Sequence, residues 1–501
     1  MIKRVGIIVG LLVAIVLLPV LLRKKSATAA PDAADDRLVI ITPHNESIRN
    51  EYGEAFARWW KERSGRSVYV DWRTPGGTAE IRKVLDSGYA AAEARGAAGM
   101  GIDLFFGGGD YEFKTQHKPK KGEGRLVRLE VFDKHPEWFG EKGVTQYFSG
   151  EQYYNDERTW VTACLSQFGI CYNEDALKRL GLPVPRGWED LGDPRYAGYL
   201  ALADPSKSGS VARAFELLIQ QQMQQVISSA DPSMPSEKVR QQGWEKGWQL
   251  IMRLCANARY FTDSASKIPQ DVGQGDSVAG MCVDFYGRSF SDELMRDDGT
   301  SRLRWIAPAG GSSLSGDPIA VMSGAPNPLV AQAFVEFVLS DAGQILWNAK
   351  PGTENGPVSK ALRRMPVRRD MYTPENRARF SDGEMNPYEA TGEFVYKPEL
   401  TGKAFGTIRS LVRIVGIDSH EEMKSAWKAL REANFPPDAM KVFFDVSVLE
   451  YQSMSLGDPR LGSGDALDAA ARASELGAHF RAQYQRAEAM ARDALAKGGT
   501  P

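Results

Sequence analysis

The chain has 501 residues, which is enough for two or three domains. With 43% hydrophobic and 25% charged residues, its composition is that of an ordinary globular protein. A formal net charge of −2 offers no excess of positive charge to a nucleic-acid partner. Five scattered histidines and the lack of a Cys-x-x-Cys pattern argue against a zinc cluster.

The first element is an apolar run over residues 5–22, with basic residues on both sides. About 18 residues in a helix span roughly 27 Å, close to the hydrocarbon thickness of a bilayer. Residues 1–25 are therefore predicted to be a signal-anchor or a signal peptide. Ala27-Thr28-Ala29 fits a cleavage site, whereas Arg23-Lys24-Lys25 favours a retained transmembrane helix. Residues 26–36 are predicted to be a linker.

Strands and helices then alternate. Residues 38–41, 67–72 and 102–106 are predicted strands, and helices are expected over residues 47–62 and from Thr78 onwards. Glycines follow the third strand at residues 107–109. This order indicates an α/β lobe with a mostly parallel sheet.

The rest of the chain continues with the same two kinds of element. Strands are predicted at residues 159–173, 199–203, 278–285 and 317–322. Helices are predicted at residues 211–227, 244–256, 329–339, 419–432 and 465–497. The basic segment 114–124 is predicted to be a solvated loop.

Four cysteines occur, at Cys164, Cys171, Cys255 and Cys282. An even number in an exported chain fits two disulfides, and four cysteines allow three pairings. The most local pairing joins Cys164 to Cys171 and Cys255 to Cys282. The alternative is that some of them are buried thiols.

Several motifs occur in an order that resembles one family. They are Asp103 to Gly109, Tyr172 to Leu177, Gly181-Leu182-Pro183, Gly187 to Leu191, Ala203-Asp204-Pro205, Gly275-Asp276 and Asp317 to Val321. Together they cover about residues 38–370 and resemble the extracellular solute-binding proteins of ABC importers, closest to the ferric-iron-binding branch. The resemblance implies an α/β, two-lobe type II periplasmic binding protein fold.

The resemblance also implies a domain plan. Lobe one would combine residues 37–160 and 305–360, and lobe two would be residues 161–304. Residues 361–501 would form a mostly helical C-terminal extension that packs on the lobes. The ligand would be held in the cleft between the lobes.

Three loops before predicted helices are candidate ligand-binding segments, because helix N-termini attract anions. The candidates are Thr42, His44 and Asn45; Gly76, Gly77 and Thr78; and Ser206, Ser208, Gly209 and Ser210. Gly108 and Gly109 would let the backbone approach the ligand. The second segment is equally explained as a helix entry turn, whereas capping needs only one of the serines in the third.

Asp284, Tyr286 and Arg288 complete the predicted site. Ferric-binding relatives typically carry a tyrosine pair here, but this chain has Phe285 before Tyr286. Tyr286 is thus a candidate metal ligand that lacks its usual partner. The predicted ligand is ferric iron or a small anion such as a phosphate ester or a carboxylate. Iron would be a transported ligand, and no resident cofactor is predicted.

The predicted function is that of a monomeric solute-binding receptor that closes around its ligand and docks on an ABC permease in the membrane. Its predicted location is the periplasm or the outer face of the inner membrane, anchored by the N-terminal helix. The chain carries none of the common hydrolase, metalloprotease or phosphate-loop motifs, so no enzymatic activity is predicted. The alternatives are a ligand-sensing domain that signals to a membrane partner and, last, a hydrolase.

Overall fold

A computed structural model describes residues 31, 33–119, 122–389, 394–461 and 466–498 of the chain. The predicted membrane helix or signal peptide, residues 1–25, lies outside these ranges. Within them, no helix is both long and apolar enough to cross a membrane.

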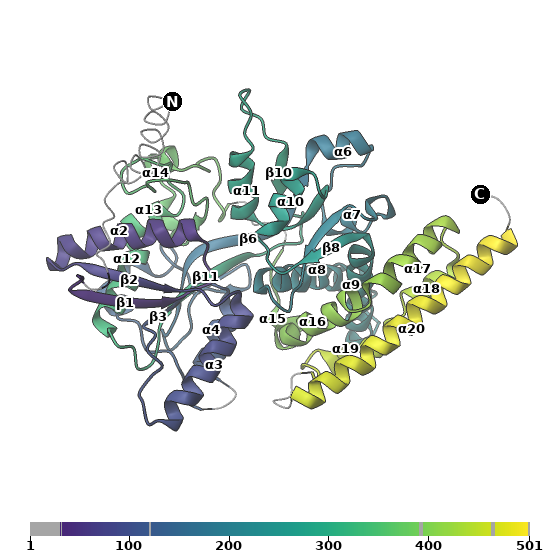
Figure 1. Cartoon of the computed structure of the whole chain (residues 1–501), viewed down its shortest axis with the longest axis horizontal. Helices are drawn as coiled ribbons and strands as arrows, with labels where there is room; N and C mark the ends of the chain where they lie inside the picture. Colours follow the sequence, from purple (N-terminus) through teal and green to yellow (C-terminus); the bar gives the residue numbers. More distant parts are fainter. Residues whose placement is uncertain (1–30, 32, 120–121, 390–393, 462–465, 499–501) are drawn as a thin grey trace, which may run out of the picture.

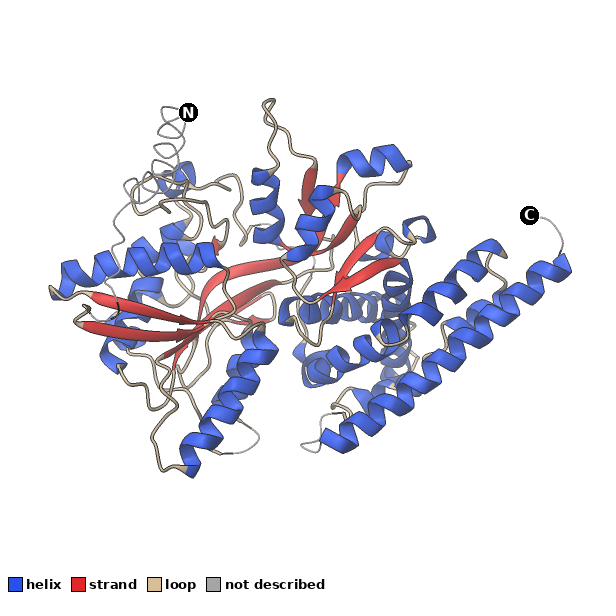
Figure 2. Cartoon of the chain, viewed as in Figure 1, coloured by secondary structure: helices blue, strands red, loops and turns tan. Residues whose placement is uncertain are grey.

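One mixed sheet runs through the body of the molecule (Figure 2). Its strands follow the order β2-β1-β3-β11-β6-β9-β7-β8, and β10 and β12 also pair with β6. The strands are β1 (Asp36–Ile41), β2 (Val68–Arg73), β3 (Leu104–Phe106), β6 (Val161–Asn173), β7 (Leu200–Ala203), β8 (Ala258–Thr262), β9 (Ala279–Val283), β10 (Leu303–Ile306), β11 (Leu314–Val321) and β12 (Met365–Pro366). A separate hairpin joins β4 (Tyr147–Phe148) to β5 (Glu151–Gln152).

Strand β6 belongs to both halves of this sheet. Its residues 161–167 pair with β11, while residues 168–172 pair with β9. The chain passes from the first half to the second along β6 and returns through β10 and β11. The register of β11 against β6 shifts between Asp317 and Pro318, next to the point where the halves meet.

The first lobe has both faces of its sheet covered. Along β1, Leu38 and Ile40 belong to one hydrophobic cluster, whereas Val39 and Ile41 belong to a second. This alternation follows from the two-residue period of a strand, and buried parallel strands are apolar throughout. The helices of this lobe are α2 (Glu46–Ser64), α3 (Thr78–Ala94), α4 (Asp110–His117), α5 (Val131–Lys134), α12 (Pro328–Leu339) and α13 (Asp341–Leu346).

The second lobe packs helices around β7, β8 and β9. Two long helices, α8 (Gly209–Ser229) and α9 (Ser236–Asn257), lie against each other, and Gly243 of α9 sits over the backbone of Met223. The remaining helices are α6 (Glu174–Leu180), α7 (Trp188–Leu191), α10 (Lys267–Gln274) and α11 (Asp284–Glu293).

The C-terminal part is helical, as predicted: residues 374–379 lie beside α13 of the first lobe, whereas the helices from residue 398 onwards pack on the second lobe (Figure 1). The Trp244 indole N–H of α9 donates to the Leu449 carbonyl at 2.6 Å, and the Trp427 indole donates to Asn257 at 2.9 Å. The helices are α14 (Pro374–Arg379), α15 (Pro398–Thr401), α16 (Phe405–Val412), α17 (His420–Glu432), α18 (Pro437–Phe443), α19 (Tyr451–Met454) and α20 (Ala466–Gly498). Helix α20 lies along α17 and α18.

Some predicted elements end elsewhere. The strand predicted over residues 278–285 stops at Val283, because helix α11 begins at Asp284. The loop predicted over residues 114–124 begins inside α4, which continues to His117. The boundaries proposed for the two lobes stay predictions.

The disulfide prediction is wrong for this structure, because all four cysteines are free and buried. Cys164 and Cys171 lie on the same extended strand, β6, where seven residues span roughly 23 Å, far beyond the reach of a disulfide. Cys255 lies on α9 and Cys282 on β9. The alternative of buried thiols therefore holds.

A thiol titration checks this directly. We expect the native protein to react negligibly with Ellman's reagent, because the thiols are buried and burial raises the pKa of Cys255 to about 12. After unfolding in guanidinium, four thiols should react. Two or fewer reactive thiols in the unfolded protein would reveal a disulfide and contradict the structure.

Candidate functional site

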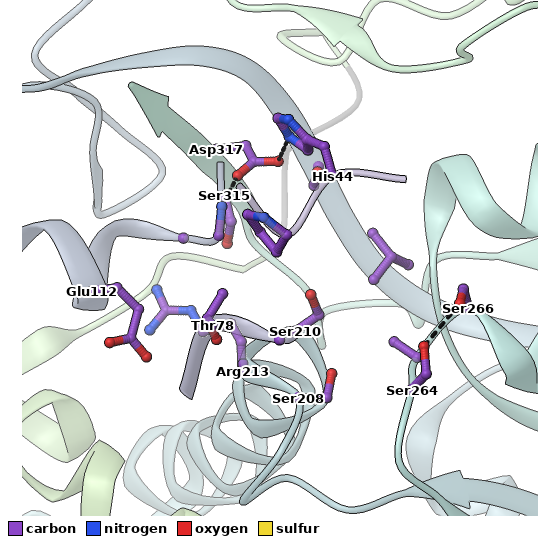
Figure 3. Close-up of a pocket in the computed structure, with 18 of the residues that line it drawn as sticks. His44, Thr78, Glu112, Ser208, Ser210, Arg213, Ser264, Ser266, Ser315 and Asp317 are labelled. Carbon is purple, nitrogen blue, oxygen red and sulfur yellow. Dashed lines mark hydrogen bonds and ion pairs between the residues drawn. The ribbon is translucent and has the colours of Figure 1, made fainter. Parts of the chain in front are cut away.

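A cavity of about 600 Å³ lies between the two lobes. Its walls come from the N-terminal ends of helices in both lobes, from β6 and β11, and from two residues outside the lobes, Arg364 and Phe405. Because helix N-termini present unpaired N–H groups, such walls attract anions. Figure 3 shows Thr78, Ser208 and Ser210 among the residues around it.

Helix α3 brings its N-terminus to the cavity without a side-chain cap. Gly77 is its N-cap, and the carbonyl of Gly77 accepts the Ile81 amide at 3.0 Å. The amides of Thr78 and Ala79 have no acceptor within the described part of the chain. The Thr78 hydroxyl is also without a partner there, although the residue is only 6% exposed. These donors are free for a ligand.

Helix α8 supplies the facing N-terminus. The Ser208 hydroxyl caps the helix by accepting the Val211 amide at 3.4 Å. The amides of Gly209 and Ser210 find no acceptor among the described residues. Lys207 is exposed beside them and forms no ion pair with any described residue. One cation and several N–H groups therefore meet here.

The two N-termini approach each other so closely that glycine is needed on both sides. A methyl group on Gly77 would lie 2.5 Å from the Lys207 carbonyl oxygen. A methyl group on Gly209 would lie 2.5 Å from the Thr78 hydroxyl oxygen. The positive ends of both helix dipoles thus reach one small region of the cleft.

A buried ion pair forms one wall of the cavity. The Arg364 guanidinium lies 2.5 Å from the Asp317 carboxylate, which also contacts His44 Nε2 at 3.2 Å and the Gly108 amide. Burial alone would raise the pKa of the Asp317 carboxyl, but Arg364, His44 and the amide hold it well below its usual range. Burial lowers the pKa of His44, so its imidazole is neutral at pH 7.

A second buried arginine, Arg213, lies on the α8 side. Both oxygens of the Glu151 carboxylate accept from it at 2.6 Å, and Glu216 accepts at 2.6 Å. Its guanidinium lies 3.7 Å from the centre of the Tyr396 ring. Glu151 comes from the β4–β5 hairpin, so this pair joins segments from both ends of β6.

The aromatic pair at the start of α11 is poorly suited to chelation. Tyr286 lines the cavity, and burial raises the pKa of its phenol to about 12. Phe285 lies under the Arg364 guanidinium, 4.3 Å from ring centre to Cζ. The neighbouring Phe285 ring carries no donor, so the pair offers one phenol instead of two.

The structure brings most of the predicted ligand-binding residues to one cavity. Those on its lining are His44, Asn45, Gly76, Gly77, Thr78, Gly108, Gly109, Ser208, Gly209, Ser210 and Tyr286. Asn45 is also the cap of α2, since its side chain accepts the Ile48 amide at 3.0 Å.

Four predicted residues lie off this lining: Thr42, Ser206, Asp284 and Arg288. The Thr42 hydroxyl donates to the Phe106 carbonyl at 2.6 Å, which ties two strand ends together. Arg288 and Asp284 pair with each other at 2.7 Å, because they are one helical turn apart on α11. Arg288 then turns to the Arg363 carbonyl, away from the ligand space.

Sequence reasoning missed Arg213, Arg364 and Phe405. Arg364 and Phe405 lie in segments with no clear periodicity, and only the fold brings them to the cleft. Asp317 stood in a family motif, but its charge was not assigned a role. The shift in strand register beside it was not readable from the sequence, and such bulges re-aim side chains.

We expect Asp317→Asn to lower the free energy of unfolding by about 3 kcal/mol at pH 7, because it leaves Arg364 buried without its counter-charge. The native pKa of Asp317 is depressed, so its stabilisation is complete above about pH 4 and is lost as the pH falls further. Urea unfolding at pH 7 and pH 3 should therefore show a difference from wild type that shrinks in acid.

The matched control is Asp133→Asn, which removes one partner of an exposed pair with Arg128 and should change stability little. Equal stability of Asp317→Asn and wild type at pH 7 would contradict the inferred role of the buried pair.

Comparison with known proteins agrees with this architecture. Residues 126–368 match the family model of the bacterial extracellular solute-binding proteins. The phosphoglycerate transport regulatory protein PgtC of Salmonella typhimurium is 27% identical over 195 residues, which is 39% of this chain and 42% of PgtC. The chain thus matches less than half the length of this curated relative.

Two solved structures show similarity at lower identity. The substrate-binding protein of an ABC transporter from Agrobacterium tumefaciens is 15% identical, covers 80% of this chain and 97% of its own, and has a TM-score of 0.52. Iron-bound HitA from Pseudomonas aeruginosa is 16% identical, covers 75% and 99%, and has a TM-score of 0.49.

The match over residues 126–368 agrees with the resemblance to extracellular solute-binding proteins that the motifs predicted. The chain has the two-lobe fold of periplasmic binding proteins, with an added helical C-terminal part. Proteins of this kind bind small ligands, work with ABC permeases and act outside the cytoplasm.

Proposed function

We propose that the protein is the receptor of an ABC importer and that it captures a small anion, a phosphate ester or a carboxylate, by hinge closure. The observation that carries this proposal is the meeting of two helix N-termini across the cleft. Free amides of α3 and α8 and the unpartnered Thr78 hydroxyl converge there, and Lys207, whose ammonium forms no ion pair with a described residue, also lines the cavity.

The acidic side chains that line the cavity are compatible with an anionic ligand. Glu112 and Asp317 are paired with arginines, and Asp110 with Lys114 at 2.6 Å. Glu80 and Asp263 form no ion pair with a described residue, and Asp263 is exposed. They suit a ligand whose anionic head is followed by hydroxyl groups, which can donate to carboxylates.

An anion explains this donor set better than ferric iron. Hard Fe³⁺ prefers several anionic oxygens from one cluster, whereas the lining offers a single tyrosine, Tyr286, because Phe285 stands where a second phenol would be. Asp317 is already engaged by Arg364, His44 and Gly108. No cluster of three potential His, Cys, Asp or Glu metal ligands occurs in the described ranges.

A sensing role is the second candidate. The PgtC proteins are named as regulatory proteins of phosphoglycerate transport, and this chain carries a helical extension beyond its two lobes. In a strain without the gene, lost ligand uptake would favour import. Retained uptake with lost ligand-dependent gene expression would favour sensing.

The ligand class is tested by native mass spectrometry of the purified protein, followed by thermal-shift measurements with 3-phosphoglycerate, citrate, inorganic phosphate and ferric salts. We expect the phosphate ester or carboxylate to raise the melting temperature, because a ligand that binds only the folded state stabilises it. A shift with ferric salts alone would overturn the anion proposal.

Lys207→Ala should weaken binding of the active anion about tenfold, since it removes a charge-assisted donor. The control Lys238→Ala removes an exposed lysine on α9, remote from the cavity, and should leave the affinity unchanged. Titration calorimetry of both variants gives the comparison.

The variant Gly77→Ala tests whether the two lobes must approach each other for the ligand to bind. The backbone at Gly77 has φ −71° and ψ 179°, which any residue adopts, so the variant should fold normally. Its methyl group would meet the Lys207 carbonyl only when the lobes are together. We expect weaker anion binding, because the methyl group opposes the approach of the two lobes seen in this structure.

Gly477→Ala on α20 is the matched control, because its methyl group would meet only the flexible end of Arg481. Full affinity in Gly77→Ala, measured by calorimetry, would show that the observed approach of the lobes is not required for binding.

A further inference from the structure

Helix α16 of the C-terminal part contacts both lobes beside the cavity. Its Arg409 is 4% exposed and donates to three acceptors. Nη1 lies 3.1 Å from the Glu112 carboxylate of α4 in the first lobe. Nε donates to the Pro205 carbonyl at 3.0 Å, and Nη2 to the Ser206 carbonyl at 3.4 Å, both in the second lobe.

The second-lobe acceptors belong to the turn that leads into the ligand-binding end of α8. Pro205 and Ser206 directly precede Lys207 and the free amides of Gly209 and Ser210. Arg409 therefore fixes the backbone of this turn from behind without facing the ligand itself. It is a positioning residue.

The first-lobe contact is a buried ionic cluster. Glu112 is 2% exposed and lies between Arg409 and Arg82, whose Nη1 is 3.2 Å away. The neighbouring Tyr111 ring lies 4.7 Å from the Phe405 ring, and Phe405 lines the cavity. An ion pair and an aromatic contact thus join α4 to α16.

Helix α16 itself is held on the second lobe. It packs beside α8, and the following turn of helix accepts the Tyr484 hydroxyl of α20 at its Val415 carbonyl, 3.1 Å away. When the lobes separate, α16 should therefore stay with the second lobe. The contacts that must break are those to Tyr111 and Glu112.

A second segment of the C-terminal part makes a similar connection. The Tyr396 amide donates to the Ser149 carbonyl beside the β4–β5 hairpin at 2.9 Å. Its hydroxyl donates to Glu216 of α8, also at 2.9 Å. Two sets of contacts, one from Arg409 and one from Tyr396, therefore join the C-terminal part to segments on both sides of the cleft.

We propose that α16 is a clasp: its Arg409–Glu112 and Phe405–Tyr111 contacts hold the lobes near the closed position before ligand arrives. Opening would leave the Glu112 carboxylate with Arg82 alone and would strip Arg409 of its carboxylate partner, which disfavours wide separation. Ligand exchange then requires the clasp to release. The clasp would regulate ligand exchange at the proposed binding site, so this inference rests on the proposed function.

Distance measurements between spin labels on the ligand-free protein test the clasp. Lys83→Cys on α3 and Lys238→Cys on α9 are exposed positions in different lobes, and the four native thiols are buried. We expect one narrow distance distribution for the otherwise wild-type chain. Arg409→Ala should broaden it and shift it to longer distances.

Arg413→Ala is the matched control, because Arg413 lies one turn further along and, among the residues that the structure describes, forms its ion pair with the nearby Asp418. Its distribution should equal that of wild type. If Arg409→Ala fails to fold, Glu112→Gln removes the same charge pair from the first-lobe side and leaves the carbonyl bonds of Arg409 intact. A folded Arg409→Ala or Glu112→Gln protein with the wild-type distribution would overturn the clasp.

Release of 3-phosphoglycerate, followed by stopped flow, provides a second readout. Arg409→Ala should release it about tenfold faster, and Arg409→Lys should recover part of the slow release. If no variant binds this anion, the proposed ligand class fails, while the ligand-free distances still decide whether the clasp exists. An unchanged release rate in a binding-competent Arg409→Ala protein would count against it.

Discussion

The arrangement of this molecule depends on one strand, β6, whose backbone hydrogen bonds belong to both halves of the sheet. Because the pleat of a continuous strand fixes the direction of its neighbours, the two lobes face each other across the part of β6 that changes partners. The charged groups at that crossing pair within the protein, since Ser166 contacts Arg364 and Arg364 neutralises Asp317 on β11, while Arg364 Nε and His44 Nδ1 have no partner in the described part of the chain. The cleft wall is therefore preorganised, whereas the helix ends on either side remain free to bind.

The proposal that the cleft binds an anion rests on the difference between its paired carboxylates and its unpaired backbone amides. The buried carboxylates there have arginine partners, so their negative charge is neutralised within the protein. The amides at the ends of α3 and α8 have no such partner in the described part of the chain, and the positive ends of the two helices lie close together. Two like poles brought together repel in the absence of ligand, so an anion between them gains more than it would at either helix alone.

Much of this was readable from the sequence for a physical reason. Strands such as 38–41 and helices such as 47–62 carry a strong periodicity, and loops at strand ends in α/β sheets are where ligands bind. Gly77, Thr78, Ser208 and Ser210 were therefore found. Arg364 and Phe405 were not predicted, since they reach the cleft only through long-range packing. Arg288 was predicted to bind ligand but pairs with Asp284, its neighbour on the same helix. The disulfide prediction failed because an even number of cysteines says nothing about the distances between them. Strand β6 holds Cys164 and Cys171 apart.

The C-terminal part alters how a two-lobe receptor reports its ligand. A ligand shifts an equilibrium between open and closed forms only by the difference in its affinity for the two. Contacts from α16 and Tyr396 to both lobes favour the closed form whether or not ligand is present. They therefore reduce the difference in conformation between the ligand-free and the ligand-bound protein, which is what a permease or a sensor could detect. They also slow both the binding and the release of ligand. The strength of the Arg409–Glu112 contact would then set the balance between retention of the ligand and response to it.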